Sequence, residues 1–180
     1  MITLDKTRQR KVHCRQIDTV IYEGDADSIV VEGMLKDERF LDTYHPTDER
    51  RPPFIVHNMI IRMELQLPEL VIRDIEVEMP AAPHAACHEV KQCLAPIKGM
   101  RIAAGFTARV RKLVDRKAGC THLQALLAAM APAAFQGAWS ARVSQPIDPV
   151  SYRGMAKNLK DSCWVWRDDG PLVRKLIDSE

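Results

Sequence analysis

The sequence lacks a long hydrophobic run and an excess of charge of either sign. No apolar stretch in its 180 residues approaches the roughly 20 residues that a membrane-spanning helix needs. It carries 26 Lys and Arg against 24 Asp and Glu, a formal net charge of +2. A balanced charge argues against a nucleic-acid binder held by a large basic surface and against a strongly charged disordered chain. We therefore expect an ordinary folded protein that binds neither nucleic acid nor a membrane.

Signals for export and for disulfide bonds are also missing. The start, Met1 to Lys6, has no apolar segment of the kind found in a secretory signal. The five cysteines are odd in number, widely spaced, and include no Cys-x-x-Cys pair. Such a pattern without an export signal is typical of free thiols in a reducing compartment. We expect a cytoplasmic protein that forms a single domain over residues 1–180.

The common enzyme fingerprints are absent as well. The sequence contains no GxGxxG, no P-loop, no GxSxG elbow and no HExxH. Any chemistry must therefore come from individual titratable side chains, and we expect no cofactor.

Hydrophobic patterning predicts strands in the first half of the chain. The best strand alternates apolar and polar residues with period two, which leaves one apolar face. A three-residue link after Leu67 sets that residue opposite Val71, aligns the apolar faces and places Arg62 opposite Glu76. The polar stretch 36–53, with three prolines, predicts a long loop. The four predicted strands are Val12–Tyr22, Ser28–Leu35, Phe54–Leu67 and Val71–Met79.

The second half predicts helices over His84–Ile97 and Phe106–Arg116, and a third that begins with a capping box at Thr121 and Gln124. Pro132 should kink or end this third helix, with 133–143 as a separate segment. A late Asp-Gly pair at residues 169–170 predicts a short C-terminal strand or hairpin. The predicted class is α+β: an antiparallel sheet of about four strands packed against about three helices.

Two groups with possible chemistry lie in unusual settings. His57 falls on the apolar face of its strand, either as a core histidine bonded to a carbonyl or as a general acid or base. Cys120 and His122 begin the third helix, where free backbone N–H groups favour a thiolate. The alternative there is a simple helix cap.

A set of arginines and acidic residues is the third group. Most of its members are expected to pair on a solvated sheet face, and in the functional alternative an arginine grips a substrate carboxylate bidentately. The candidates for substrate binding are Arg15, Arg62, Asn58, Asp74 and Glu76, and the set also includes Asp37.

An ordered series of short motifs over about residues 8–175 resembles the DUF2889 family, a bacterial domain of unknown function. Where that family usually has His-Asp-Met, this chain has His57-Asn58-Met59, and where it has Thr-Glu, this chain has Gln124-Ala125. The resemblance implies a cytoplasmic bacterial protein of small-molecule catabolism and supplies no catalytic roles. The motifs are His13-Cys14-Arg15, Val30 to Asp37, His57-Asn58-Met59 with Arg62, Asp74-Ile75-Glu76, Pro83 with Cys87, Gly105-Phe106, Gly119 to Leu123, Gln136 and Cys163.

Three functions stay open. The first is a cofactor-independent lyase that releases formaldehyde or water from an aromatic or other small organic substrate, with His57, His122 and Cys120 as catalytic residues. The second is a protein that holds zinc, and the third is a non-catalytic binding or assembly module. We also expect a homodimer, formed through strand edges or exposed tryptophans (Trp164 and Trp166). The zinc ligands would be Cys87, Cys120, His122 and Cys163 or His57.

Overall fold

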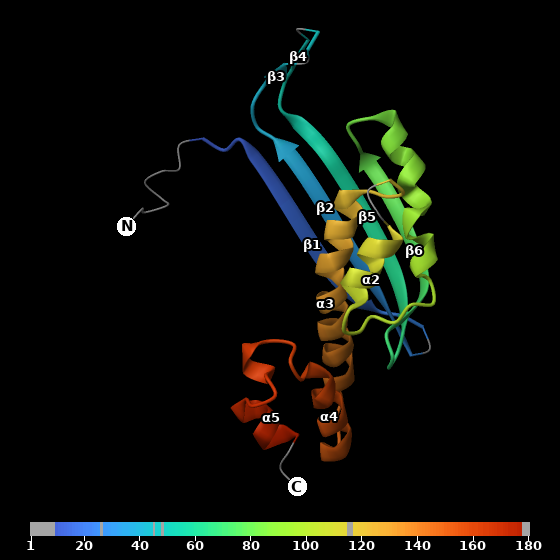
Figure 1. Ribbon diagram of the computed structural model, residues 1–180, viewed down its shortest axis with the longest axis vertical. Coiled ribbons are helices and arrows are strands. Elements are labelled where there is room, and N and C mark those ends of the chain that lie inside the picture. Colours follow the sequence, from blue (N-terminus) through green and yellow to red (C-terminus); the bar gives the residue numbers. More distant parts are fainter. Residues whose placement is uncertain (1–9, 26, 45, 48, 115–116, 178–180) are drawn as a thin grey trace. The chain divides into compact units, whose positions relative to one another are not determined.

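The computed structural model describes residues 10–25, 27–44, 46–47, 49–114 and 117–177. The chain forms two compact units, of which the first ends at Gly137 and the second begins at Ala138. The first is built on an antiparallel sheet and the second is helical (Figure 1). The α+β class is therefore confirmed, whereas the single domain over 1–180 stays a prediction.

Four long antiparallel strands make the sheet of the first unit, in the order β1-β2-β5-β6. All four predicted strands are confirmed. The prediction of a loop over 36–53 is wrong in part, because β2 continues through the first of these residues and a small two-stranded ribbon, β3–β4, forms further on. The strands are β1 (His13–Glu23), β2 (Ser28–Arg39), β3 (Thr43–Tyr44), β4 (Arg50–Arg51), β5 (Phe54–Gln66) and β6 (Val71–Ala81).

The register between β5 and β6 follows from burial. Arg62 lies opposite Glu76, as predicted, and the same alignment holds from Ile61 to Glu64. Nearer the turn a bulge shifts the pairing, so that Leu65 faces Ile72 and Gln66 faces Val71. The predicted pairing of Leu67 with Val71 is therefore wrong. The Leu65 and Ile72 side chains are buried, and the bulge places both on the core face. Without the bulge, the alternation along β6 would turn Ile72 to the opposite face of the sheet.

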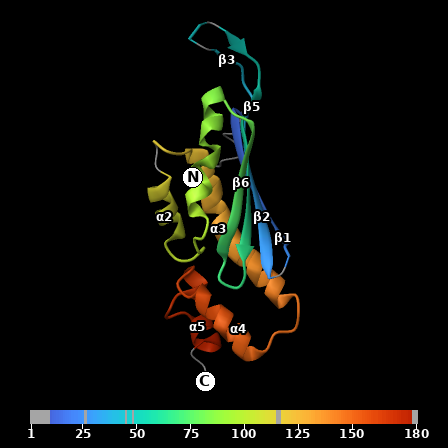
Figure 2. The ribbon, with the colours of Figure 1, turned by 90° about the vertical axis from the view of Figure 1, so that its right-hand side faces the viewer.

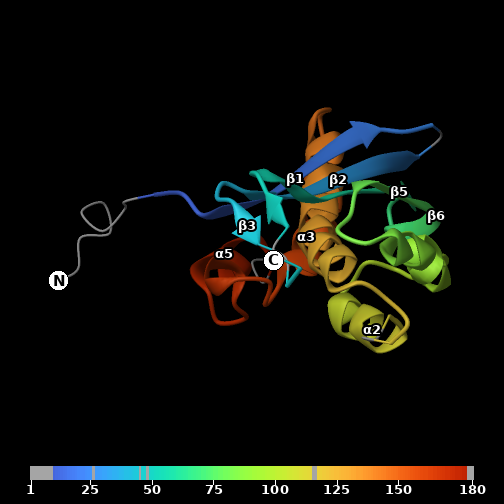
Figure 3. The same ribbon diagram turned by 90° about the horizontal axis from the view of Figure 1, so that it is seen from above.

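Helices cover one face of the sheet (Figures 2 and 3). The main one, α3, runs close to β2, and Gly33 explains how: a Cβ there would overlap with Met130 of α3 and lie 3.1 Å from Leu126 Cδ1. The core between sheet and helix consists of side chains that are each worth about 1.5–3 kcal/mol when buried. The helices of this unit are η1 (Ala85–Ile97), α2 (Phe106–Leu113) and α3 (Thr121–Val143), of which the residues from Ala138 onward belong to the second unit.

Two predictions about α3 are wrong. The helix continues through Pro132 without a break. Met130 and Ala134 are buried on either side of the proline, and this packing outweighs the roughly 3 kcal/mol that a proline costs inside a helix. The capping box does not form either. Cys120, whose carbonyl accepts from the Gln124 amide at 3.0 Å, is the N-cap residue, and the Gln124 side chain donates to the Val114 carbonyl instead.

The second unit contains helices where a C-terminal strand or hairpin was predicted, so that prediction is wrong. Pro171 occupies the first turn of α5, a position where its fixed φ and missing N–H suit a helix. Trp139 and Tyr152 pack edge to face with ring centroids 5.3 Å apart. None of the described helices is long and apolar enough to cross a membrane. The helices are α4 (Pro149–Ala156), η2 (Lys157–Leu159), η3 (Trp164–Trp166) and α5 (Pro171–Leu176).

Candidate functional site

A buried carboxylate, Asp37, lies at the centre of the site. It sits near the end of β2 and is only 2% exposed. Arg15, its register partner on β1, grips it with two hydrogen bonds of 2.7 Å, from Nε to Oδ1 and from Nη2 to Oδ2. These two hydrogen bonds from Arg15 hold the pKa of Asp37 below its ordinary value, although burial acts in the opposite direction. The carboxylate is therefore ionised at neutral pH.

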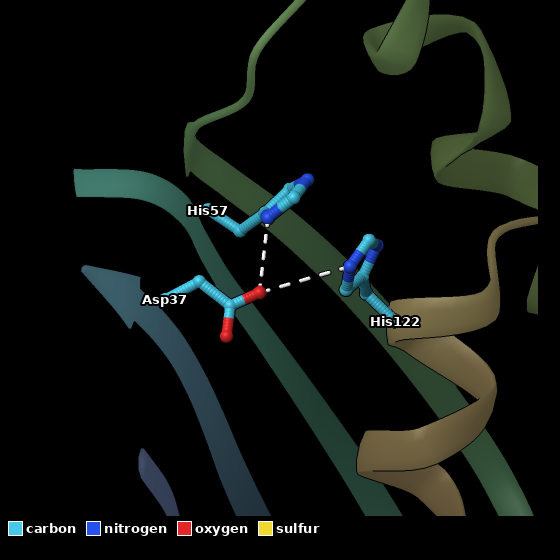
Figure 4. Close-up of side chains that lie close together, drawn as sticks. All are labelled: Asp37, His57 and His122. Atoms are coloured by element: carbon cyan, nitrogen blue, oxygen red, sulfur yellow. Dashed lines mark hydrogen bonds and ion pairs between the residues drawn. The ribbon is translucent and has the colours of Figure 1, made fainter. Parts of the chain in front are cut away.

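His57 reaches the same carboxylate from the other neighbouring strand, β5. Its Nδ1 lies 3.0 Å from Asp37 Oδ2, and its side chain is 14% exposed (Figure 4). An ionised carboxylate only accepts hydrogen bonds, so we assign the proton to Nδ1, which leaves the lone pair of the neutral ring on Nε2. His57 lies on the core face of its strand, as predicted, with a carboxylate rather than a backbone carbonyl as its partner.

His122 enters from the first turn of α3. Its Nε2 lies 3.7 Å from Asp37 Oδ2, and the rings of His122 and His57 are tilted by 32° with centroids 3.9 Å apart (Figure 4). Burial lowers the pKa of His122, and positive charge on His57 and Arg15 lowers it further, although Asp37 opposes them. His122 is thus kept neutral at neutral pH beside an anion.

Cys120 and His13 border these groups. The Cys120 sulfur lies 3.7 Å from His122 Nδ1, so the thiol, the second imidazole and the carboxylate form a continuous series. His13 of β1 lies 3.7 Å from Asp37 Oδ1 with its side chain 47% exposed. The structure therefore brings together four residues that were predicted as catalytic or substrate-binding residues: Arg15, His57, Cys120 and His122.

The central residue, Asp37, was only expected to belong to a solvated polar face. A signal for its role was present: Val31, Gly33 and Leu35 have the same parity along β2, so a carboxylate two residues further must face the core. The prediction of a loop from residue 36 concealed it. His13 opens one of the family motifs, but it was not predicted as a site residue, because only the pairing of β1 with β2 brings it close to Asp37.

Four of the predicted substrate-binding residues lie apart from Asp37. Arg62 pairs with Glu32 at 2.6 Å and with Glu78, on the sheet face that the helices do not cover. Asp74 is exposed and pairs with Lys98, and Glu76 is exposed. Asn58 follows His57 and has the opposite parity, and its Oδ1 is buried without a hydrogen-bond partner among the described residues.

The three central residues could also hold a metal ion. Asp37, His57 and His122 each offer one ligand atom, all within 4.8 Å of one another, and two imidazoles with a carboxylate suit zinc or iron. However, both oxygens of Asp37 already accept hydrogen bonds from the Arg15 guanidinium, whose positive charge opposes a cation. The predicted zinc ligands Cys87, Cys120 and His122 do not form such a group within the described ranges. Cys163 belongs to the second unit.

A hollow of about 250 Å³ lies between β6 and η1. Its lining includes the predicted substrate-binding residue Glu76, together with Glu78 and Lys91 and the apolar residues Ile75, Val77 and Leu94. None of the residues around Asp37 lines it. Its two glutamates are exposed, whereas the groups around Asp37 include two imidazoles in ring contact with each other, one of them hydrogen-bonded to the carboxylate.

Comparison with known proteins places these residues in one family. A family model described as a protein of unknown function, DUF2889, matches residues 13–136, more than half of the chain. The chain belongs to the DUF2889 family. The match contains every residue around Asp37 and ends beside Gly137, where the first compact unit ends. No curated protein and no solved structure matches the chain. The part that carries the DUF2889 match is therefore the unit that contains the site.

Proposed function

We propose that this DUF2889 protein is a small lyase that works by general acid–base catalysis without a cofactor on an aromatic or other small organic substrate. The observation that carries the proposal is the hydrogen bond between His57 Nδ1 and the buried Asp37 carboxylate, with His122 stacked beside it. A base held in one tautomer by an ionised carboxylate is the arrangement that proton abstraction needs.

Each group receives a role from its geometry. His57 Nε2, which carries the lone pair, acts as the base, and Asp37 stabilises the imidazolium that forms. His122 stays neutral and donates a hydrogen bond to the leaving group. Cys120 positions His122 through Nδ1. Arg15 uses Nε and Nη2 on Asp37, so it is chiefly a positioning residue, with Nη1 left for a substrate carboxylate or phenolate.

Two lyase reactions balance with these groups alone. In an elimination, His57 takes a proton from carbon, the neighbouring C–O bond breaks and a C=C bond forms. The hydroxide leaves as water with the proton that the His57 imidazolium returns. In formaldehyde release, the base takes the proton of a hydroxymethyl O–H, and the C–C bond to that carbon breaks. Formaldehyde then leaves, and the remaining carbon takes a proton from the His57 imidazolium. An aromatic ring next to that carbon stabilises its negative charge in either reaction.

We also propose that the protein works in a bacterial cytoplasm as a homodimer. All five cysteines are free, and only Cys163 is exposed. Unpaired, largely covered thiols are typical of proteins from reducing compartments.

A substrate panel tests the proposal. Aryl compounds that carry a hydroxymethyl group next to a benzylic carbon are incubated with the protein, with formaldehyde measured colorimetrically and new conjugated double bonds by absorbance. We expect turnover that falls by about 10²–10⁴-fold in His57→Gln, the range for loss of one acid–base group. His88→Gln, at an exposed histidine, is the matched control. Turnover that survives both His57→Gln and His122→Gln would contradict the assignment.

Metal binding is the second candidate, favoured by the three donor atoms around Asp37. Elemental analysis of protein purified without chelator separates the two. About one zinc or iron per chain, lost in His122→Gln, would favour the metal site over cofactor-free acid–base chemistry. A protein with neither metal nor turnover on a broad panel would favour a binding module.

A further inference from the structure

Strand β1 forms an edge of the sheet, and its free hydrogen-bonding groups can be assigned. The Val12 carbonyl accepts from the Phe40 amide at 3.2 Å, and the Gly24 amide donates to the Ser28 carbonyl at 3.0 Å. The β1–β2 register is unbroken between these two bonds. Since antiparallel partners alternate, the even-numbered residues of β1 bond to β2 and the odd-numbered ones, from His13 to Glu23, point their N–H and C=O groups outward. No other described strand pairs with them.

This edge is neither short nor interrupted by a proline or a bulge, although it carries charged side chains at Arg15, Asp18 and Glu23. Natural edge strands are short, contain proline or a bulge, or point charged side chains along the edge. β1 is 11 residues long, contains no proline and has no register shift against β2. Its apolar side chains are exposed instead: Val12 by 57%, Ile17 by 37%, Val20 by 45% and Tyr22 by 50%.

We propose that β1 pairs antiparallel with β1 of a second copy of this chain, about a two-fold axis at Ile17, to form one continuous eight-stranded sheet. In this register the outward-pointing odd-numbered residues bond to each other, as the free groups require. Val12 then faces Tyr22 of the second copy, Cys14 faces Val20, and Ile17 faces itself. All of the exposed apolar side chains of the edge are paired, each pair worth about 0.2–1 kcal/mol.

Charge supports the same register. β1 is basic at its start, with Lys11 just before the strand and Arg15 within it, and acidic at its end, with Glu23. Two-fold antiparallel pairing brings the basic end of one copy to the acidic end of the other, so Lys11 faces Glu23.

Alternative alignments of the two β1 strands lose hydrogen bonds or bring unfavourable pairs together. A shift of one residue would pair even-numbered groups that already bond to β2. An axis at Asp18 would set two carboxylates directly opposite each other, and an axis at Gln16 would leave Ile17 facing Arg15 and Tyr22 facing Arg10. The axis at Ile17 is therefore the register that satisfies hydrogen bonds, apolar contact and charge together.

The proposed partner strand would also border the Asp37 site. Arg15 and His13 lie on odd-numbered positions, and they would face Thr19 and Ile21 of the second copy. The side chain of Arg15 is 41% exposed in the single chain.

A cysteine pair tests the register. Cys14 and Val20 face each other at a non-hydrogen-bonded position, where Cα atoms are about 4.5 Å apart and a disulfide can form. Val20→Cys should therefore give a covalent dimer on oxidation, seen on a non-reducing gel. The double variant Val20→Cys with Cys14→Ser should not, which controls for the other cysteines. Crosslinking in Asp18→Cys but not in Val20→Cys would show the register with its axis at Gln16 and overturn the proposal.

A charge exchange tests the axis. The protein should run in light scattering at twice its chain mass of 20.4 kDa. Ile17→Lys and Ile17→Glu should each be monomeric, because like charges then meet at the axis, and an equimolar mixture of the two should recover the dimer. Recovery on mixing excludes misfolding as the cause. A monomeric natural protein at tens of micromolar, or a dimer that survives Ile17→Lys, would overturn the proposal.

Discussion

His57 and His122 stack with ring centroids 3.9 Å apart although one belongs to a strand and the other to a helix, and a single buried carboxylate, that of Asp37, faces both. Burial is the main cause that lowers the pKa of His122, so this ring stays neutral at neutral pH. The hydrogen bond of His57 Nδ1 to Asp37 leaves Nε2 of His57 for a proton. The two rings can therefore supply a base and a neutral hydrogen-bond donor at one site.

The first prediction concerns this pair. His122→Gln should lower turnover of a substrate by about 10²-fold or more, because a neutral imidazole donor is replaced by a poorer one. The measurement is kcat against pH. If His122 acts only as packing, the variant should change the Tm and leave the pH profile of kcat where it was.

A second prediction concerns Gly33, whose missing side chain lets α3 approach β2. Gly33→Ala should destabilise the protein by about 1–3 kcal/mol, because the added Cβ overlaps with Met130 and presses on Leu126. Urea unfolding measures the loss.

Gly154 of α4 is the matched control. No atom lies within 4 Å of a Cβ there, so Gly154→Ala should stabilise its helix by up to about 1 kcal/mol. A Gly33→Ala protein as stable as the natural one would mean that α3 does not pack against β2 as closely as described.

Sequence periodicity was enough to predict the sheet. Apolar alternation located the long strands. The need to bury the apolar faces of both strands on the same side of the sheet set Arg62 opposite Glu76. The same parity argument placed His57 on the core face. These features are local, so the order of residues determines them.

What the sequence could not show depends on distant packing. Pro132 does not break α3, because contacts on both sides of it hold the helix against the sheet. Asp37 was hidden for a related reason. The polar residues after it predicted a loop, whereas pairing with β1 and β5 extends β2 as far as Arg39. Only the three-dimensional register shows that Arg15, Asp37 and His57 occupy neighbouring positions on three strands.

A third prediction tests the coupling of Arg15 to Asp37. Arg15→Met should destabilise the protein by about 1–3 kcal/mol, because it leaves a buried carboxylate with fewer partners. The cost stays well below that of a fully buried pair, since the Arg15 side chain is partly exposed and solvent screens its charge.

Asp37→Asn completes the double-mutant cycle. With the charge removed, loss of Arg15 should matter less, so the double variant should be more stable than the sum of the single effects implies. Additive effects in urea unfolding would show that the two residues are not coupled.

The last prediction is the acid sensitivity of the fold. The pKa of His122 is lower in the folded protein than its ordinary 6.5, mainly because of burial. Above 6.5 the residue is neutral whether the chain is folded or not. Below 6.5 the unfolded chain takes up a proton that the folded one resists, so the free energy of unfolding should fall with pH from about 6.5 down to the folded pKa. Asp37 acts in the same direction at lower pH: its pKa lies below 3.8, and its stabilising effect is lost as pH falls through the folded value. His122→Gln should remove the upper part of this slope and leave the lower part, as measured by urea unfolding at a series of pH values. An unchanged slope just below 6.5 in the variant would assign it to other histidines.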